Sequence, residues 1–520
     1  MDVDSRSLED GAVVEAEVCI VGGGAAGITL ALELSGQSFR VALIESGGLD
    51  FDPETDALLE AINVGRSYPH LQASRLRYFG GSTNHWGGHC VPIRAVHFER
   101  RPWIPDSGWP ISRDDLDPYY VRAHAILGLG EFDYDAKRLS AALGKRMFPF
   151  DPSKVETVIS RYNPLRFGPY YHDVLQRADN LTTYLWGNLV RLDRHPSNSY
   201  VTQLAVRTLA GNAYTVRARY FVLALGGIEN ARMLLLSNAI EAAGLGNQHG
   251  LVGRYFMEHI RYWSGVILPA NQAEVVDLYG AEHPYASDLA LRGHLALPEQ
   301  LLSELEIPSY RAEIKISKNV TGSDAVYSAG IIERELKTFR WPDHLATHLL
   351  NVLSGLDDLA RYFVTSDAVL GYKLMNYVEQ TPNPDSRIGL AQERDALGLN
   401  RATVDWRLTE LDKIGIRKAL KVIADEIGRS GFGRMRIDLS EHQDVILEGA
   451  DGGAHHLGTT RMHDDPRHGV VDADCRMHDL ANCFIAGSST FPCGGYENPT
   501  LTIVAMAIRL GDHLKALMSS

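Results

Sequence analysis

The apolar positions near the N-terminus form two four-residue runs, Val18–Val21 and Val41–Ile44, separated by a segment with apolar residues at helical spacing. Short uninterrupted apolar runs are typical of strands buried in a parallel sheet. Two further runs, at residues 220–225 and from residue 484 onward, each pass through a glycine-containing turn into an apolar helix. The pattern therefore predicts an α/β fold with a βαβ unit, whose parallel strands come from both ends of the chain.

The middle of the chain has a different pattern. Between about residues 266 and 437, polar and apolar positions alternate in runs such as 310–316 and 402–408, with helical stretches between them. Alternation of this kind indicates half-buried strands, so we expect a mixed β-sheet with helices, inserted into the first domain. The expected division has a discontinuous nucleotide-binding domain, made of 1–100, 175–265 and 440–520, and a substrate-binding domain, made of 101–174 and 266–439.

Composition narrows the class of protein. The 520 residues are 45% hydrophobic and 22% charged, and the formal net charge of −14 argues against a nucleic-acid partner. No apolar run approaches the length of a membrane span, and the acidic opening residues lack the apolar core of a signal peptide. Five scattered cysteines, without a CxxC or HExxH motif, favour reduced thiols and no metal site. We therefore expect a cytoplasmic protein.

The first chemical motif is a glycine-rich turn between the first strand and its helix. Gly22, Gly24 and Gly27 give the spacing GxGxxG, with Ala26 in the same turn. The glycines permit a tight turn, close approach of a diphosphate, and close packing of helix on strand. Glu45 lies 18 residues after Gly27, at the end of the second strand, where a carboxylate can accept ribose hydroxyls. Strand, turn, helix and acid together predict a dinucleotide site.

The chain contains one such fingerprint. Flavoprotein reductases that also bind a nicotinamide carry a second fingerprint in mid-chain, and the segment LGGIEN at 225–230 lacks the required spacing. We therefore expect FAD as the bound cofactor, without NAD(P) as a co-substrate. A nicotinamide-dependent dehydrogenase is the disfavoured alternative.

A second glycine-rich loop, RYFGGSTNHWGG at 77–88, would allow backbone to approach a flat ring system. With the fingerprint, the segment HHLGTTRM at 455–462 and the sequence NPT at 498–500, this loop resembles the glucose–methanol–choline (GMC) oxidoreductases, over about half of the chain. Its GGSTNHW sequence is most similar to pyranose 2-oxidase and FAD-dependent sugar and glycoside dehydrogenases. The resemblance implies that the loop contacts FAD through Ser82, Thr83, Asn84, His85, Trp86 and Gly87.

His85 occupies the position that carries a covalent bond to the flavin in some members of the family. Related dehydrogenases keep this histidine without the bond. The resemblance therefore leaves two states open, a histidyl-FAD link and a loop histidine that hydrogen-bonds backbone near the flavin.

The same resemblance implies a catalytic pair near the C-terminus. His455 corresponds to the active-site histidine, although its neighbour His456 would take that place if the register slipped by one residue. Asn498 is the second member, and with Pro499 and Thr500 it begins the last helix. Asn before Pro is also a good N-cap, and the positive end of this helix would stabilise an anionic reduced flavin. Further cofactor contacts are expected at Val190, Gly226 and Gly487.

Together these features predict an FAD-dependent enzyme that oxidises a hydroxyl group, with His455 as base and Asn498 as hydrogen-bond partner. The preferred substrate is a sugar or glycoside, oxidised at a secondary hydroxyl to a ketone. A non-sugar alcohol, such as a natural product or steroid, and a flavin-binding paralogue without catalysis are the alternatives. The electron acceptor, whether oxygen, a quinone or a redox protein, and the oligomeric state are left open.

Overall fold

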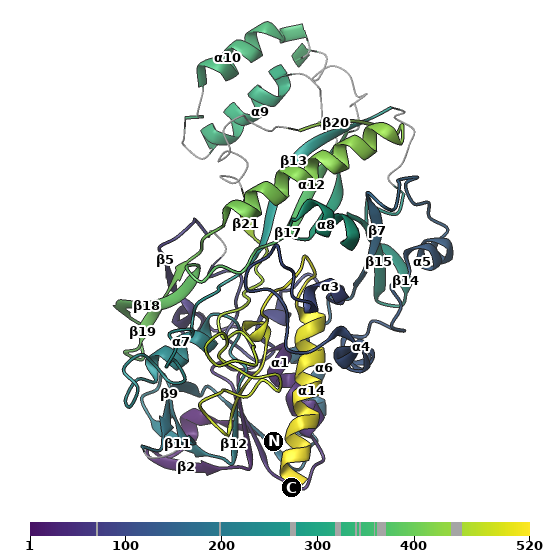
Figure 1. The fold of residues 1–520 in the computed structure, drawn as a ribbon. Helices are drawn as coiled ribbons and strands as arrows, with labels where there is room; N and C mark the ends of the chain where they lie inside the picture. Colours follow the sequence, from purple (N-terminus) through teal and green to yellow (C-terminus); the bar gives the residue numbers. More distant parts are fainter. Residues whose placement is uncertain are drawn as a thin grey trace.

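The computed structural model describes the whole chain except residues 69–70, 197–198, 271–276, 318–323, 338–340, 343–344, 358, 361–370, 438–449 and 520. In Figure 1 the two ends of the chain lie together at the bottom, the largest sheet lies above them, and a helical hairpin projects at the top. No helix among the described residues has the length and apolar character needed to cross a membrane.

The lower part is built on a six-stranded sheet in which every pairing is parallel. Its order across the sheet is β1 (Asp2–Asp4), β8 (Leu181–Leu185), β4 (Val41–Ile44), β3 (Val18–Val21), β12 (Tyr220–Leu223) and β22 (Cys483–Ile485). β3, β4, β12 and β22 are buried at every position, as the short apolar runs require. The predicted α/β fold with strands from both ends of the chain is confirmed.

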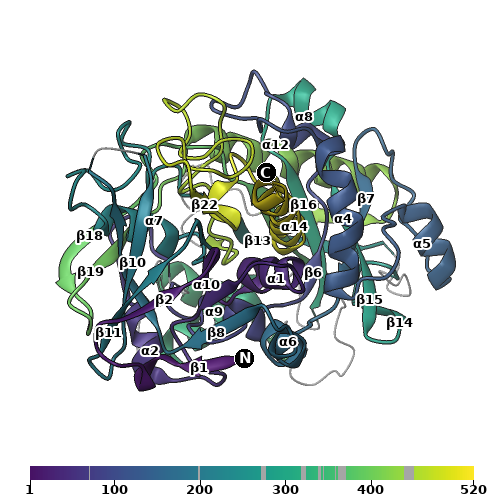
Figure 2. The same cartoon turned by 90° about the horizontal axis from the view of Figure 1, so that it is seen from below.

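Helices cover this sheet and bring distant segments together. α1 (Ala25–Leu34) lies beside α14 (Thr500–Ser519), as Figure 2 shows from below, and α4 (Arg113–Leu127) packs on the other side of α14. α6 (Phe167–Gln176) also contacts α1 and β8. A four-stranded sheet lies beside the six-stranded one, in the order β2 (Ala12–Glu15), β11 (Ala213–Arg217), β10 (Val201–Arg207) and β9 (Asn188–Arg194).

The upper part is a nine-stranded sheet. Its main path is β20 (Gly433–Arg436), β13 (His259–Pro269), β17 (Gly371–Glu379), β16 (Tyr310–Ser317), β15 (Leu289–Ala296), β7 (Glu156–Tyr162) and β6 (His89–Cys90), with β14 (His283–Ala286) on β15 and β21 (Asp451–Gly452) on β13. β16 confirms the strand predicted at 310–316. The described pairings are all antiparallel, whereas the sequence pattern suggested a mixed sheet. Alternation shows that one face of a strand is buried and carries no information about the direction of its neighbours.

The alternating run at 402–408 belongs elsewhere. β19 (Asn400–Asp405) pairs with β18 (Arg387–Arg394) and β5 (Ala61–Asn63) in a separate three-stranded sheet. This sheet packs against α7 (Glu229–Leu236) rather than on the nine-stranded sheet. The proposed two-domain division stays a prediction, and this hairpin lies beside the segments assigned to the nucleotide-binding side.

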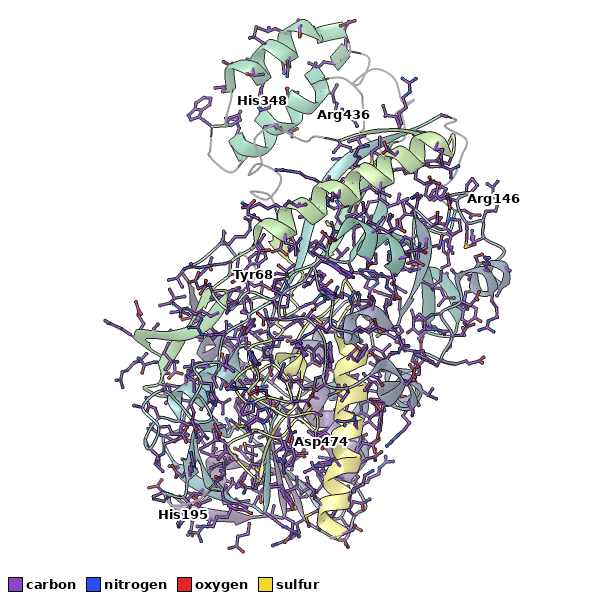
Figure 3. All side chains as sticks on the ribbon, in the orientation of Figure 1. Tyr68, Arg146, His195, His348, Arg436 and Asp474 are labelled. Carbon is purple, nitrogen blue, oxygen red and sulfur yellow. The ribbon has the colours of Figure 1, made fainter. Side chains whose placement is uncertain are left out.

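The remaining helices are short or peripheral. α9 (Asp324–Lys337) and α10 (Leu345–Ser354), which carries His348, form the projecting hairpin in Figures 1 and 3. The others are α2 (Pro53–Asp56), α3 (Ala95–Phe98), α5 (Ala136–Leu143) and α8 (Glu299–Leu305), with 3₁₀ turns η1 (Ser5–Ser7), η2 (Ala57–Leu59), η3 (Gly81–Asn84) and η4 (Ser488–Thr490).

Two hydrophobic cores hold these parts. The larger one lies around the six-stranded sheet and the helices that cover it, and the smaller one lies between the nine-stranded sheet and α12 (Glu410–Arg429). α12 crosses this sheet in Figure 1 and buries positions 416, 419, 420, 423 and 427, which recur at helical spacing. The candidate site is found where β3 and β4 end and β13 begins, next to both cores.

Candidate functional site

The main cavity has a volume of about 600 Å³ and reaches from the fingerprint turn to the catalytic pair expected from the sequence. Its walls come from the ends of β3, β4 and β12, the loop at 81–89, residues 452–456, residues 486–488 and the start of α14. Pockets of this size, at the carboxyl ends of parallel strands, are the usual place for a ligand in an α/β protein.

The fingerprint glycines have the packing that their spacing predicts. Gly22 has φ of +108° and faces the carbonyl of Ala224, so a side chain there would clash with the backbone of β12's end. Gly27 packs directly on the carbonyl of Gly22. Glu45 accepts hydrogen bonds from the backbone N–H of Gly23 (2.6 Å) and Gly47 (3.0 Å), which holds the carboxylate at the end of β4.

The cavity fits a dinucleotide with an acidic diphosphate. Gly24, Gly226 and Gly487 face open space within the cavity, since an added Cβ at any of them would meet no atom within 4 Å. Arg77 also lines the cavity, and its buried Nη1 lies 3.9 Å from the Glu229 carboxylate. Bare backbone beside a positive charge is the kind of surrounding that a diphosphate requires.

The second glycine loop is held from behind. The Arg166 guanidinium donates to the carbonyl oxygens of Thr83 (3.2 Å) and Trp86 (2.7 Å). The Trp86 indole N–H donates to the Leu165 carbonyl at 2.8 Å. His85 lies in the cavity wall with its side chain exposed, and partial desolvation lowers its pKa below the usual value, so the imidazole is neutral near pH 7.

Most of the cofactor residues expected from the sequence line this cavity. They are Gly22, Gly24, Ala26, Glu45, Ser82, Thr83, His85, Trp86, Gly87, Gly226, Gly487, Asn498, Pro499 and Thr500. Three do not line it. Gly27 lies beneath the turn, Asn84 turns its amide to the Phe79 carbonyl (2.9 Å), and Val190 lies next to the lining residue Leu189 on β9.

His455 and Asn498 meet at one end of the cavity. The Asn498 amide nitrogen is 3.3 Å from His455 Nε2, although the two residues are 43 positions apart in sequence. His455 Nδ1 is 2.6 Å from Nδ1 of His259, the first residue of β13. His456 also lines the cavity but turns away from Asn498, and its Nε2 lies 3.2 Å from the Tyr68 hydroxyl.

Burial keeps both members of the histidine pair neutral. It holds the pKa of His455 well below its usual value, and the neighbouring His259 and His456 lower it further. Burial and the charge of Arg311 lower the pKa of His259 to about 4, against backbone acceptors at Gly494 and Gly495. A neutral imidazole has one donor nitrogen and one acceptor nitrogen, so the 2.6 Å contact contains a single proton.

A buried carboxyl group supports His455 from the backbone side. Glu258 accepts two hydrogen bonds from the His455 N–H, at 3.1 and 2.9 Å, and one from the Tyr68 hydroxyl. Burial raises the pKa of Glu258 to about 7. Tyr68, labelled in Figure 3, lies near the meeting of the lower part and the nine-stranded sheet.

Several residues that sequence reasoning missed belong to this site. Glu258 and His259 stand together just before an apolar strand, which is a weak signal that could have been noted. Arg311 occurs in the strand 310–316, where every second residue is charged, and that face turns toward the catalytic pair. Arg75 and Glu229 form a buried ion pair of 3.0 Å beside the cavity.

The arrangement of His455 and Asn498 in the cavity suits the transfer of a hydroxyl proton. A neutral imidazole and a carboxamide converge on one end of a cavity whose other end is shaped for a diphosphate. Such a pair can receive a hydroxyl proton and hold the oxygen in place. No group of side chains suited to hold a metal ion occurs among the described residues.

Comparisons with known proteins agree with this arrangement. Residues 382–507 match the family described as GMC oxidoreductase. The chain is 24% identical to the 2-methyl-1,2-propanediol dehydrogenase of Mycolicibacterium austroafricanum (97% of this chain, 96% of the relative). It is 25% identical to the 6'''-hydroxyparomomycin C oxidase of Streptomyces lividus (96% and 92%). Among solved structures, pyridoxine 4-oxidase from Mesorbium loti superposes with a TM-score of 0.59 at 17% identity, covering 96% of this chain and 99% of that one.

Proposed function

The chain is a GMC oxidoreductase, and on that premise we propose that it oxidises a secondary hydroxyl of a sugar or glycoside to a ketone, with His455 as the base. The observation that carries this proposal is the 3.3 Å approach of the Asn498 amide to His455 Nε2 at the end of the cavity. Enzymes of this family are flavoproteins, and FAD supplies the hydride acceptor when it is bound.

The residues that would hold FAD follow from the cavity. The fingerprint turn and the N-terminus of α1 would receive the diphosphate, with the Arg77 side chain as a nearby positive charge. Glu45 would accept the ribose hydroxyls. The loop at 81–89 and the segment at 498–500 would contact the flavin, and whether His85 forms a covalent bond to it is part of the proposal.

The protein's own residues manage the hydroxyl proton. His455 Nε2 faces Asn498 and is neutral because burial lowers its pKa, so its lone pair is available near pH 7. The Asn498 amide donates a hydrogen bond to the same region, which fixes the orientation of the substrate oxygen. His455 Nε2 would accept the hydroxyl proton, and bound FAD would supply the hydride acceptor that a ketone product requires.

The cavity wall next to this pair is polar, which favours a sugar over a steroid. Arg261 lines the wall and is held by Asp451 through two hydrogen bonds of 2.8 Å. His89 also lines it, and burial lowers its pKa to about 4, so it offers a neutral donor and acceptor. Fixed polar groups around a reacting hydroxyl suit a substrate with several hydroxyl groups.

A second candidate is a small non-sugar alcohol, because one relative that matches the whole chain is named for a propanediol. The electron acceptor (oxygen, a quinone or a redox protein) and a cytoplasmic location are kept as parts of the proposal.

The test is anaerobic mixing of the purified yellow protein with free sugars, glycosides, diols and simple alcohols, followed by flavin absorbance. We expect bleaching by sugars or glycosides, and readmitted air then separates an oxidase from a dehydrogenase. Bleaching by diols alone would replace the sugar proposal with the second candidate.

The adjacent histidines provide a matched control for the base. His455→Ala should lower the rate of flavin reduction by roughly 10²- to 10⁴-fold while FAD stays bound. His456→Ala removes a neighbouring imidazole that does not face Asn498, and should have a much smaller effect. An unimpaired rate in His455→Ala would refute the assignment.

A further inference from the structure

Arg311 on β16 lies directly behind the catalytic pair. Its side chain is 2% exposed and donates to Asn498 Oδ1 at 3.5 Å and to Ser160 Oγ at 3.3 Å. Its guanidinium lies over the ring of Tyr377, 4.6 Å from the centroid. A guanidinium group has donors only, so the Asn498 oxygen, and not its NH₂ group, must face Arg311.

The orientation of Asn498 decides the protonation of His455. With its oxygen turned to Arg311, the amide presents its NH₂ group to His455 Nε2, 3.3 Å away. An NH₂ group can only donate, so His455 Nε2 must accept and carries no proton. In the neutral ring, the proton is then on Nδ1.

The contact with His259 is compatible with this tautomer, and the orientation of Asn498 decides its direction. Nδ1 of His455 and Nδ1 of His259 are 2.6 Å apart, and one proton is shared between them. His455 carries it, so His259 Nδ1 accepts and His259 Nε2 is protonated. His259 Nε2 is buried on the side of Gly494 and has no hydrogen-bond partner among the described residues, so its proton points toward the neighbouring backbone without a direct acceptor.

We propose that Arg311 and His259 are positioning residues that fix His455 in the Nδ1–H tautomer. They do so through a chain of hydrogen bonds in which Arg311 donates to Asn498, Asn498 donates to His455, and His455 donates to His259. This inference rests on the proposed role of His455 as the base. This chain of hydrogen bonds keeps Nε2 unprotonated before substrate arrives, with its lone pair accepting from the Asn498 amide until the substrate hydroxyl takes the place of that amide. When Nε2 takes the hydroxyl proton, the hydrogen bond from Nδ1–H to His259 stabilises the charged ring.

The setting of Arg311 supports a functional role over a purely structural one. Within the described ranges, it forms no ion pair with any carboxylate within 4.0 Å, and its Nε has no hydrogen-bond partner. Burying a cation without a paired anion opposes folding. By contrast, Arg292 on the same face of the sheet is paired with Glu282 (3.0 Å) and Glu313.

The direct test is the tautomer of His455 in holoenzyme labelled with ¹⁵N-histidine, assigned by loss of its signal in His455→Asn. We expect the Nδ1–H form in the wild type. Arg311→Met frees the amide to turn over, and should give a mixture of tautomers. Asn498→Asp keeps a partner for Arg311 but cannot donate, and should switch His455 to the Nε2–H form. An Nε2–H form in the wild type would overturn the proposal.

Kinetics provide the second readout. Arg311→Met and His259→Leu should each slow flavin reduction by roughly 10- to 100-fold, the usual effect of losing an outer hydrogen-bond partner. His259→Asn, whose side-chain oxygen can replace Nδ1 as acceptor, should recover most of the rate and the shape of the pH profile. Unchanged rates and an unchanged tautomer in both disruptive variants would refute the role.

Arg161→Met is the matched control for removing a buried guanidinium. Arg161 is 1% exposed and donates to the carbonyls of Leu129 (2.7 Å) and Asp133 (3.0 and 2.7 Å), outside the catalytic pair. It should leave the tautomer of His455 unchanged. If no alcohol reduces the wild-type flavin, the proposed function fails, while the spectrum still decides the tautomer. If Arg311→Met does not fold, Asn498→Asp and His259→Leu carry the same test.

Discussion

Replacing Arg101 by methionine should weaken the connection between the lower part and the nine-stranded sheet. Arg101 follows α3, and its guanidinium binds Glu379, the last residue of β17, through hydrogen bonds of 2.7 and 2.5 Å. The two side chains are 3% and 1% exposed. Glu379 also accepts from the Ser309 N–H at 3.0 Å. Without Arg101, a buried carboxylate would keep that single backbone donor and the distant ring of His97, 3.8 Å away.

The magnitude follows from the burial of the pair. Breaking a buried ion pair by removing one partner costs about 3–5 kcal/mol, because the remaining charge is left without compensation. Unfolding entropy is about 2.1 cal/mol/K per residue, or about 1.1 kcal/mol/K for a chain of 520 residues, so Tm should fall by about 3–5 °C if the chain unfolds as one unit. Lys421→Met, which removes an exposed partner of Asp425, is the control and should change Tm by less than about 1 °C.

The assay is thermal unfolding of Arg101→Met, Glu379→Gln and the double variant, at several pH values. The double variant should lose less than the sum of the two single variants, since each single variant leaves a lone buried charge and the double variant leaves none. Burial acts to raise the pKa of Glu379, but Arg101 holds it well below its usual value, so the pair stabilises the fold above about pH 4.5 and less below it. Without Arg101, burial alone raises the pKa of Glu379, so this carboxyl takes up a proton as pH falls and the deficit of Arg101→Met should shrink from pH 7 toward 4.5. Strictly additive single variants, or a deficit independent of pH, would refute this reasoning.

Three further outcomes are expected. Gly226→Ala should weaken FAD binding by about tenfold, or about 1.4 kcal/mol, because the added methyl group enters the cavity. The control is Gly211→Ala, at a surface turn with a similar φ (+107° against +86° at Gly226), which should leave the flavin content unchanged. Equal flavin content in both variants would contradict this prediction. Because the pKa of His455 is well below its usual value, the rate of flavin reduction should stay level from pH 8 to below pH 6.5 and fall only when Nε2 is protonated. The groups that lower this pKa, besides burial, include His259, His456, Arg261 and Arg311. A fall in rate centred at or above pH 6.5 would contradict the lowered pKa. The five cysteines are buried and burial raises the pKa of each thiol, so a thiol reagent should label none in the native protein and five after denaturation; rapid labelling of the native protein would contradict this.

The parts of the fold that could be predicted from sequence are those with local signals. The strand, turn and acid around Gly22 and Glu45 are encoded within about thirty residues, and the structure places them as expected. The side chain of Asn84 could not be placed in the same way, because its amide bonds back to Phe79 within its own loop. A glycine-rich motif limits the path of the backbone but does not determine where each neighbouring side chain points.

The surroundings of the proposed catalytic pair were only partly predictable, because they depend on contacts between distant parts of the chain. His455 and Asn498 stand in recognisable segments, but His259 lies 196 residues from His455 and is brought to it by the start of β13. Arg311 has no local signal other than a charge in an alternating strand. Contacts between sheets that are formed by distant parts of the chain depend on tertiary packing, and the periodicity of apolar residues does not predict such packing.

The groups around His455 explain how a histidine with a low pKa would suit the proposed role of base. A histidine with a pKa well below its usual value is unprotonated at neutral pH, but it holds an incoming proton weakly unless its surroundings respond to the new charge. His259 responds, because the hydrogen bond from His455 Nδ1–H to His259 strengthens once the His455 ring is charged. Burial therefore keeps the proposed base free of its proton at rest, while its buried partner His259 stabilises the charged form as it appears.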